Sequence, residues 1–297
     1  MKILFREKKN DNVDHGFFIN SMKEIFEESV KVIDNNTGEI ICVFMKGVLS
    51  SHKIDEKLVK HSKSKSNNRG NASGKIDIKY HGDNISHFID KPDLNVGKKI
   101  SMDGTSTRSS AYPVRTDGTL IKRTRCNYVS SVSVGSFNKS NIKGGTAPCR
   151  HTAWTKRNSE AMTSLFPLLK EAEEIFKKEI PDKYKYQRDF CDKIENWTIN
   201  NSIFSTITLN YDFRTATHTD KGDLKGGMTC FAVKSYGEWC GSYLCFPEYD
   251  IGVDVKDNDL LLFNPHLVHC NTEMIGEGRM SMVLYTREKL IDCDAED

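Results

Sequence analysis

Residues 259–286, which read DLLLFNPHLVHCNTEMIGEGRMSMVLYT, decide the fold. They hold two short β-rich segments, 259–263 and 280–286, separated by a stretch that contains Pro, Asn and Gly. Four more segments of the same kind precede them, at 203–211, 228–233, 242–246 and 251–255. Six short strands within about 85 residues predict a β-barrel or a β-sandwich.

Helices are predicted ahead of this β-rich region. Between 159 and 180 the apolar residues recur at spacings of three and four, the pattern of an amphipathic helix, and they are Met162, Leu165, Phe166, Leu169, Ala172, Ile175 and Phe176. The helix should end before Pro181, and a second one is expected over 182–193. Nearer the amino terminus we expect a hairpin of 30–34 with 39–44 and a short helix over 51–60.

The predicted fold class is therefore mainly β with flanking helices (α+β). Residues 1–124 are expected to supply the amino-terminal strands and helices, and residues 125–297 the β core with its preceding helices, in one compact unit. Within the first part, residues 61–84 lack periodicity and are poor in apolar residues, so we expect an exposed, partly flexible insert that anchors no core.

Charge is unevenly distributed along the chain. Residues 53–150 hold 19 Lys and Arg against 8 Asp and Glu, a net charge of +11, while the remainder holds 24 against 33, a net charge of −9. A basic region of this size favours binding to polyanions such as nucleic acid, although a solvated Lys-rich insert has the same composition.

Several protein classes are excluded by the sequence. The longest apolar run is six residues, Ile40 to Met45, too short to span a membrane. The start of the chain lacks a secretory apolar segment, so we expect an intracellular protein, nuclear if the cell is eukaryotic. The sequence does not define the oligomeric state, and a monomer is the favoured expectation. The nine Cys are an odd number with no Cys-x-x-Cys motif, which favours reduced, mostly buried thiols over disulfides or structural zinc.

A His-x-Asp motif at His218 and Asp220 is the first candidate for chemistry. Residues i and i+2 of a strand point the same way, so the imidazole and the carboxylate can bind one metal ion. A non-haem iron site needs a second imidazole and leaves other positions open for substrate and oxygen. A second copy of the motif, His81 and Asp83, lies in the polar insert and is interpreted as a chance match.

The third iron ligand is predicted to be His269, which follows Asp220 after several strands. His266 is the alternative, and His269 is preferred because Arg279 follows it by ten residues. Arg279 opens a strand, and a guanidinium is suited to the distal carboxylate of 2-oxoglutarate. The hydroxyl of Ser281, two residues on, can reach the same carboxylate.

The residues around these motifs resemble the TET/JBP family of Fe(II)/2-oxoglutarate-dependent nucleic-acid-modifying dioxygenases. The resemblance rests on 211–214 ahead of the His-x-Asp motif, on 241–247, on 259–271, and on 279–285, with a looser likeness over 148–155. It implies a double-stranded β-helix (jelly-roll) core. It also implies oxidation of the 5-methyl group of 5-methylcytosine or thymine in DNA, with Fe(II), 2-oxoglutarate and O2.

The resemblance also implies roles for individual residues. His218, Asp220 and His269 would bind iron, and Arg279 would bind 2-oxoglutarate with help from Arg214. The extruded base of double-stranded DNA would be held by Asn138, Asp223, Tyr285 and Arg287, with Tyr285 stacking on the ring. Arg287 can only donate hydrogen bonds, which favours 5-methylcytosine over thymine unless Asp223 or Asn138 supplies an acceptor. The alternative is a 2-oxoglutarate hydroxylase of a protein or small molecule.

Overall fold

The computed structural model describes residues 1–64, 69–76, 125–126, 129–142 and 145–293. Most of its strands belong to two sheets. The larger has nine strands in the order β1 (Lys2–Arg6), β3 (Val30–Asp34), β4 (Ile40–Met45), β16 (Leu260–Phe263), β12 (Thr229–Ser235), β19 (Arg279–Tyr285), β11 (Thr206–Tyr211), β7 (Ser131–Phe137) and β10 (Arg150–His151). The smaller has four, β17 (Cys270–Asn271), β14 (Leu244–Phe246), β15 (Ile251–Val253) and β2 (Glu24–Phe26).

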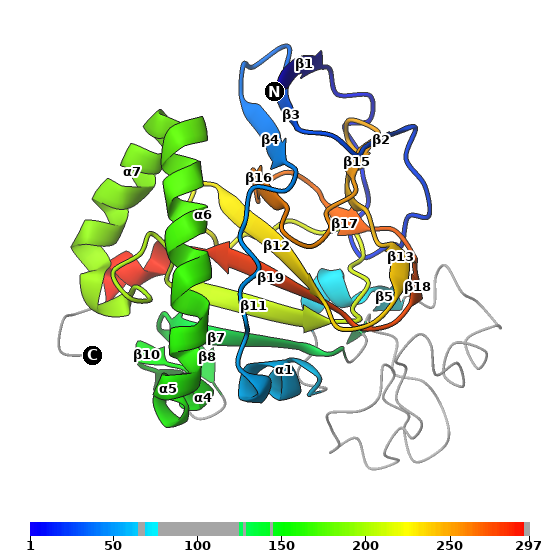
Figure 1. Ribbon diagram of the computed structural model, residues 1–297. Helices are drawn as coiled ribbons and strands as arrows, with labels where there is room; N and C mark the ends of the chain where they lie inside the picture. Colours follow the sequence, from blue (N-terminus) through cyan, green and yellow to red (C-terminus); the bar gives the residue numbers. More distant parts are fainter. Residues whose placement is uncertain (65–68, 77–124, 127–128, 143–144, 294–297) are drawn as a thin grey trace, which may run out of the picture.

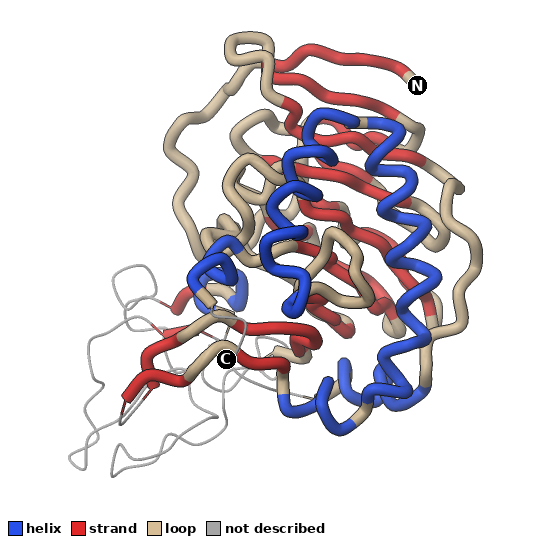
Figure 2. The backbone as a smooth tube through the Cα atoms, turned by 90° about the vertical axis from the view of Figure 1, so that its left-hand side faces the viewer, coloured by secondary structure: helices blue, strands red, loops and turns tan. Residues whose placement is uncertain are grey.

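The two sheets face each other across an apolar core, which is the jelly-roll architecture. Phe231 and Phe263 of the larger sheet pack in one cluster with Phe246 and Val253 of the smaller one. The other face of the larger sheet is covered by helices, as Figures 1 and 2 show. Strands with both faces covered read as continuous apolar runs, which explains the composition of β12 and β16.

Five helices and three two-stranded ribbons complete the described chain. The helices are α1 (Glu56–Ser62), α4 (Ala153–Arg157), α5 (Ser159–Met162), α6 (Phe166–Glu179) and α7 (Pro181–Cys191). Short 3₁₀ segments are η1 (Gly70–Ser73), η4 (Thr163–Leu165), η5 (Asp192–Trp197) and η6 (Glu288–Asp292). The ribbons pair β13 (Trp239–Gly241) with β18 (Met274–Gly276), β5 (Lys75–Ile76) with β6 (Arg125–Cys126), and β8 (Ser140–Ile142) with β9 (Gly145–Ala147). No described helix has the length and apolar character needed to cross a bilayer.

The helix predicted over 159–180 is divided into α5, η4 and α6. The division falls at Pro167, which has no N–H to donate to the carbonyl one turn earlier, so the preceding turn tightens into a 3₁₀ segment. The apolar stripe is continuous across the division, because Leu165, Leu169 and Phe176 all pack in the core against the larger sheet.

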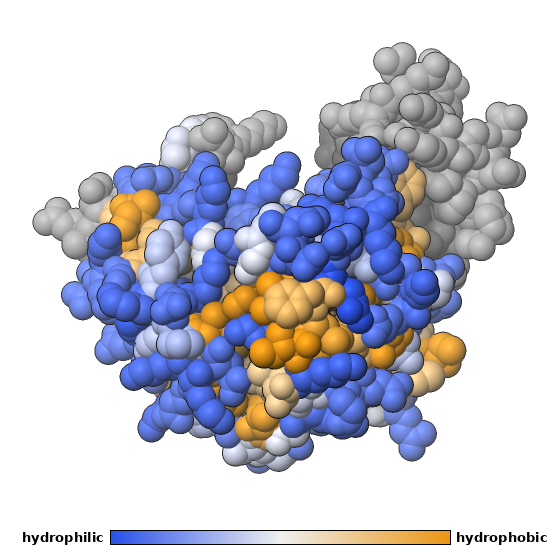
Figure 3. Space-filling view, turned by 90° about the horizontal axis from the view of Figure 1, so that it is seen from above, coloured by the Kyte–Doolittle hydropathy of each residue, from blue (hydrophilic) through white to orange (hydrophobic). Residues whose placement is uncertain are grey.

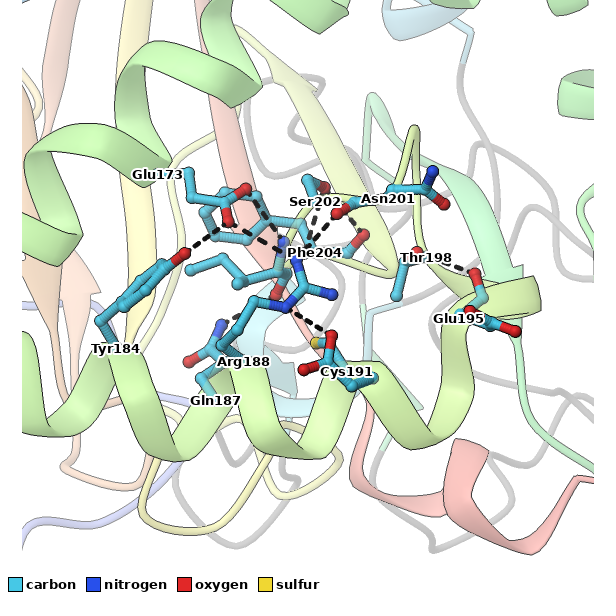
Figure 4. Close-up of polar contacts among 12 residues, drawn as sticks. Glu173, Tyr184, Gln187, Arg188, Cys191, Glu195, Thr198, Asn201, Ser202 and Phe204 are labelled. Carbon is cyan, nitrogen blue, oxygen red and sulfur yellow. Dashed lines mark hydrogen bonds and ion pairs between the residues drawn. The ribbon is translucent and has the colours of Figure 1, made fainter.

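Polar contacts fasten α6 and α7 to the chain that enters β11 (Figure 4). The buried amide of Gln187 donates to the Ile203 carbonyl at 3.0 Å and accepts from the Met228 N–H at 3.1 Å. Arg188 donates to the Asn201 carbonyl at 2.8 Å, and Glu173 accepts from the Tyr184 hydroxyl at 3.1 Å. These bonds fix the start of β11, whose far end leads to the His-x-Asp motif.

The amino-terminal strands belong to the same sheets as the carboxyl-terminal ones. The predicted hairpin is β3 and β4, and β4 pairs with β16 over four residues. β1 lies at the sheet edge and exposes Ile3 and Phe5. Seen from the end of the molecule where these strands lie, the surface is mostly hydrophilic, with a central apolar patch and smaller apolar areas toward its edges (Figure 3).

Two predictions about the insert and the cysteines are wrong. Residues 69–74 are not a wholly exposed loop: Ala72 and Ser73 are buried, and the Ala72 carbonyl accepts from the Ala216 N–H at 2.9 Å. The rest of the insert that the structure leaves undescribed includes His81 and Asp83, so the chance match lies outside the described residues. Not all thiols are reduced either, because Cys149 and Cys293 form a disulfide, with Cα atoms 6.0 Å apart.

The Cys149–Cys293 disulfide is expected to stabilise the fold. It joins positions 144 residues apart and ties the end of the chain to the segment before α4. Closing a long loop restricts the unfolded chain, so reduction should lower the free energy of unfolding by about 2–4 kcal/mol. Thermal unfolding of the wild-type protein with and without a reductant measures this. A Cys149→Ser variant, already without the bond, serves as the control that should not respond.

Candidate active site

His218, Asp220 and His269 come together at one mouth of the jelly-roll. One ligand atom from each lies within 4.8 Å of the others, so among the described residues these three form a group that could hold a metal ion. The Nε2 atom of His269 is 3.3 Å from Asp220 Oδ2, and the Nε2 atom of His218 is 3.7 Å from Asp220 Oδ1. Two reciprocal backbone hydrogen bonds between His218 and His269, at 3.0 and 2.9 Å, hold the two imidazoles together.

Hydrogen bonds to the rear of both imidazoles fix their tautomers. His218 Nδ1 is 2.7 Å from the Ala216 carbonyl, and His269 Nδ1 is 2.9 Å from the Leu267 carbonyl. A carbonyl oxygen can only accept, so Nδ1 carries the proton and Nε2 presents its lone pair to the cluster. Two lone pairs and a carboxylate that converge in this way form a favourable arrangement only around a cation.

The electrostatics of the cluster agree with metal binding. Burial and the neighbouring His269 lower the pKa of His218 to about 4, which keeps this imidazole neutral. Burial alone would raise the pKa of Asp220, but His269, His218 and Arg69 hold it at about 2. The cluster therefore offers two imidazole nitrogens and one anionic oxygen, the ligand set that a non-haem Fe(II) ion takes.

His266 lies outside the cluster. Its backbone N–H is held by the Asn264 side chain at 3.0 Å, and its own Nε2 is buried without a hydrogen-bond partner. The group that could hold a metal ion therefore contains His269, the ligand preferred on the spacing to Arg279, and does not contain His266.

A pocket of about 410 Å³ opens in front of the three ligands. Its wall on β19 is set by strand alternation: Val283 and Tyr285 face the pocket, whereas Met282 and Leu284 pack under the helices. Phe231, Phe263 and Leu244 from the other strands supply apolar surface.

Arg279 and Ser281 lie on the same face of β19, behind the wall of the pocket. The Arg279 guanidinium is 2% exposed and lies against the rings of Phe231 and Trp239. Its Nε and Nη2 atoms are buried with no hydrogen-bond partner, and burial lowers its pKa to about 10. An unpartnered buried guanidinium fits a ligand carboxylate, so the residues present suit 2-oxoglutarate. Ser281 accepts at 3.3 Å from Asn210, which lines the pocket.

Three of the four residues expected to hold a base line the pocket. The Tyr285 hydroxyl is 3.2 Å from the Thr208 hydroxyl and accepts from Arg287 Nη2 at 3.0 Å. Asp223 forms a β-bridge with Arg287, and its Oδ2 accepts from the Thr229 hydroxyl at 2.9 Å. Burial and the nearby Asp220 raise the pKa of Asp223 well above its usual value.

Asn138 and Arg214 do not lie where they were expected from the sequence. Asn138 follows the end of β7, does not line the pocket, and donates its amide to the Lys139 carbonyl. Arg214 is also absent from the pocket wall, because its Nη2 donates to the Ile19 carbonyl and the Asn20 side chain. Arg214 thus fastens the amino-terminal segment beside the site.

Two residues that line the pocket, His15 and Arg69, were not predicted from the sequence. The first is carried by the amino-terminal segment, which pairs with Thr217 through backbone hydrogen bonds of 2.7 and 2.9 Å. The second comes from the polar insert. A basic residue within a sequence of Ser, Asn and Gly carries no pattern that distinguishes it from its exposed neighbours.

A jelly-roll with a His-x-Asp motif, a distal His and a buried Arg on a late core strand defines the class of 2-oxoglutarate- and Fe(II)-dependent oxygenases. Comparison with known families gives the particular one. The Tet_JBP family, described as the oxygenase domain of the 2OGFeDO superfamily, matches residues 134–288, and the chain belongs to this family.

Curated relatives align with about half of this chain. Thymine dioxygenase JBP1 of Trypanosoma brucei brucei is 36% identical over 148 residues, which are 48% of this chain and 17% of the relative. The bifunctional helicase and thymine dioxygenase JBP2 of Leishmania infantum is 34% identical over 154 residues, 50% of this chain and 14% of the relative. The chain thus spans less than a fifth of the length of these relatives.

A solved structure of NgTET1 in complex with 5mC DNA aligns with 97% of this chain and 83% of its own chain. The TM-score is 0.48 and the sequence identity 9%.

Proposed function

We propose that this protein oxidises the 5-methyl group of a pyrimidine in DNA, with thymine as its preferred substrate. One observation carries the proposal: the pocket in front of the His-Asp-His cluster is also lined by an aromatic ring, an acid and two guanidinium groups. These are the groups needed to hold a flat, polar heterocycle beside a metal. The identity to thymine dioxygenases over 148 residues supports the same substrate class.

His218, Asp220 and His269 would hold Fe(II), and Arg279 with Ser281 would hold 2-oxoglutarate. Once bound, this pair supplies the oxidising chemistry that acts on a methyl group with O2. The chain's part is to orient the ligands through the Ala216 and Leu267 carbonyls, and to exclude water with the apolar wall around Phe231 and Phe263.

The base subsite is formed by Tyr285, Arg287 and Asp223. Enzymes that act on a base in a duplex have to take the nucleotide out of the stack, and the Tyr285 ring in the pocket wall offers a surface on which the base can rest. The Asp223 carboxyl supplies the acceptor that Arg287 lacks, in either protonation state. The expectation of 5-methylcytosine depended on Arg287 being able only to donate hydrogen bonds. With Asp223 as an acceptor in the same pocket, that property of Arg287 does not distinguish 5-methylcytosine from thymine.

Mass spectrometry of nucleosides tests the proposal. The protein is incubated with Fe(II), 2-oxoglutarate and one of two duplexes. In the first, thymine is the only 5-methylpyrimidine, and the second contains both thymine and 5-methylcytosine. The expected product is 5-hydroxymethyluracil from both duplexes. Oxidised 5-methylcytosine as the dominant product would show that 5-methylcytosine, and not thymine, is the preferred substrate. Succinate formation with a peptide or small molecule, and none with DNA, would contradict the proposal and favour the alternative hydroxylase.

A further inference from the structure

Arg69 reaches into the pocket from outside the β core. Its Nε donates to the Ser131 hydroxyl at 2.8 Å, and its Nη2 donates to the Ser133 hydroxyl at 2.9 Å. Both serines lie on β7, two residues apart and therefore on one face of the strand. The guanidinium is thus oriented by two defined hydrogen bonds, although it comes from a sequence with no apolar anchor of its own.

The segment that carries Arg69 is fastened to the active site. The Arg69 N–H donates to the Ser73 hydroxyl at 2.6 Å, and the Ala72 carbonyl accepts from the Ala216 N–H at 2.9 Å. Ala216 also orients the metal ligand His218. The backbone of Ala216 therefore holds both the segment that carries Arg69 and the imidazole of His218.

A chain of side-chain hydroxyls joins Arg69 to the proposed base subsite. The Ser133 hydroxyl is 3.0 Å from that of Thr208, which is 3.2 Å from the Tyr285 hydroxyl, the acceptor for Arg287. Two guanidinium groups are in this way held in one pocket although their charges repel each other.

No carboxylate among the described residues forms an ion pair with Arg69. Of the two acids in the pocket wall, Asp220 lies between His218 and His269, and Asp223 accepts from Thr229. When the site is loaded, the charges of Fe(II), Asp220, both carboxylates of 2-oxoglutarate and Arg279 sum to zero. The charge of Arg69 is then not balanced by the cofactors. Because a pyrimidine base is neutral, only the phosphate groups of the DNA can balance it.

We infer that Arg69 binds a phosphodiester group of the DNA next to the extruded nucleotide. The inference rests on the proposed function and adds a substrate-binding residue to it. A guanidinium matches phosphate oxygens in geometry and charge, and contacts of this kind set the position of a duplex without reading its sequence.

The test compares R69Q and R69K with the wild type and with K170Q. Lys170 is an exposed cation on α6, on the far face of the larger sheet, so K170Q loses one charge away from the pocket. DNA affinity is measured against salt concentration, 2-oxoglutarate dependence is measured by succinate release, and thermal unfolding checks the fold. R69Q is expected to bind DNA about tenfold more weakly for every sequence, with a salt slope smaller by about 1. R69K should recover part of the affinity, and K170Q should match the wild type.

Two results would overturn the inference and leave the proposed function intact. A raised requirement for 2-oxoglutarate with unchanged DNA affinity would assign Arg69 to the cosubstrate. A changed preference among bases with an unchanged salt slope would assign it to the base. A wild-type protein that neither binds nor oxidises DNA would instead defeat the proposed function, and this inference with it.

Discussion

Asp220→Ala is expected to abolish both Fe(II) binding and DNA oxidation. Asp220 is the one carboxylate in the cluster, and its loss leaves only the two imidazoles. Changes in groups that only orient metal ligands cost about 10–100-fold in affinity or activity, so loss of a direct ligand should exceed about 100-fold. The fold should survive, since the backbone N–H of residue 220 keeps its bond to the Pro265 carbonyl. Metal analysis of purified protein, product formation and thermal unfolding measure the three quantities.

His266→Ala is the matched control for the metal site. His266 lies three residues before a ligand but outside the cluster, so this variant should keep its iron. His269→Ala should lose the metal as Asp220→Ala does. Loss of iron from the His266 variant and retention by the His269 variant would reverse the assignment.

The grouping of His218, Asp220 and His269, and the strand that carries Arg279, could be predicted from the sequence because the spacing of short motifs indicates both. His218 lies in an isolated β-bridge with His269, and Asp220 follows it outside any strand. Strand alternation puts Arg279, Ser281 and Tyr285 on one shared face of β19. Where β19 pairs with β11 and β12, this alternation separates the pocket from the helix-covered core.

Long-range contacts account for what the sequence did not predict. Arg69 reaches the pocket only because Ser131 and Ser133, more than 60 residues later, meet it on β7. The disulfide joins cysteines 144 residues apart, and no spacing rule pairs such residues. Asn138 was placed by resemblance alone, and in the structure it follows the end of β7 and does not line the pocket.

Arg279→Lys is expected to raise the concentration of 2-oxoglutarate needed for half-maximal succinate release by about 10–150-fold, the equivalent of about 1.5–3 kcal/mol for a charged hydrogen bond. The Nε and Nη2 atoms that lack partners are two adjacent donors, and the single ammonium of Lys cannot form two parallel bonds to one carboxylate. Lys would also lose the contacts that the guanidinium makes with the Phe231 and Trp239 rings, at 5.5 and 5.1 Å from the ring centroids. Arg279→Met, which keeps the length but has no charge, should be at least as impaired.

Fe(II) binding distinguishes a specific effect of the Arg279 variants on 2-oxoglutarate from misfolding. Because Arg279 does not touch the His-Asp-His cluster, both variants should bind Fe(II) as the wild type does, and saturating 2-oxoglutarate should restore much of the rate to Arg279→Lys. Arg157→Lys, the same change at an exposed position on α4, should leave the cosubstrate dependence unchanged. An Arg279→Lys variant with wild-type dependence on 2-oxoglutarate would show that the cosubstrate carboxylate is bound elsewhere. The buried, unpartnered guanidinium would then need another anion.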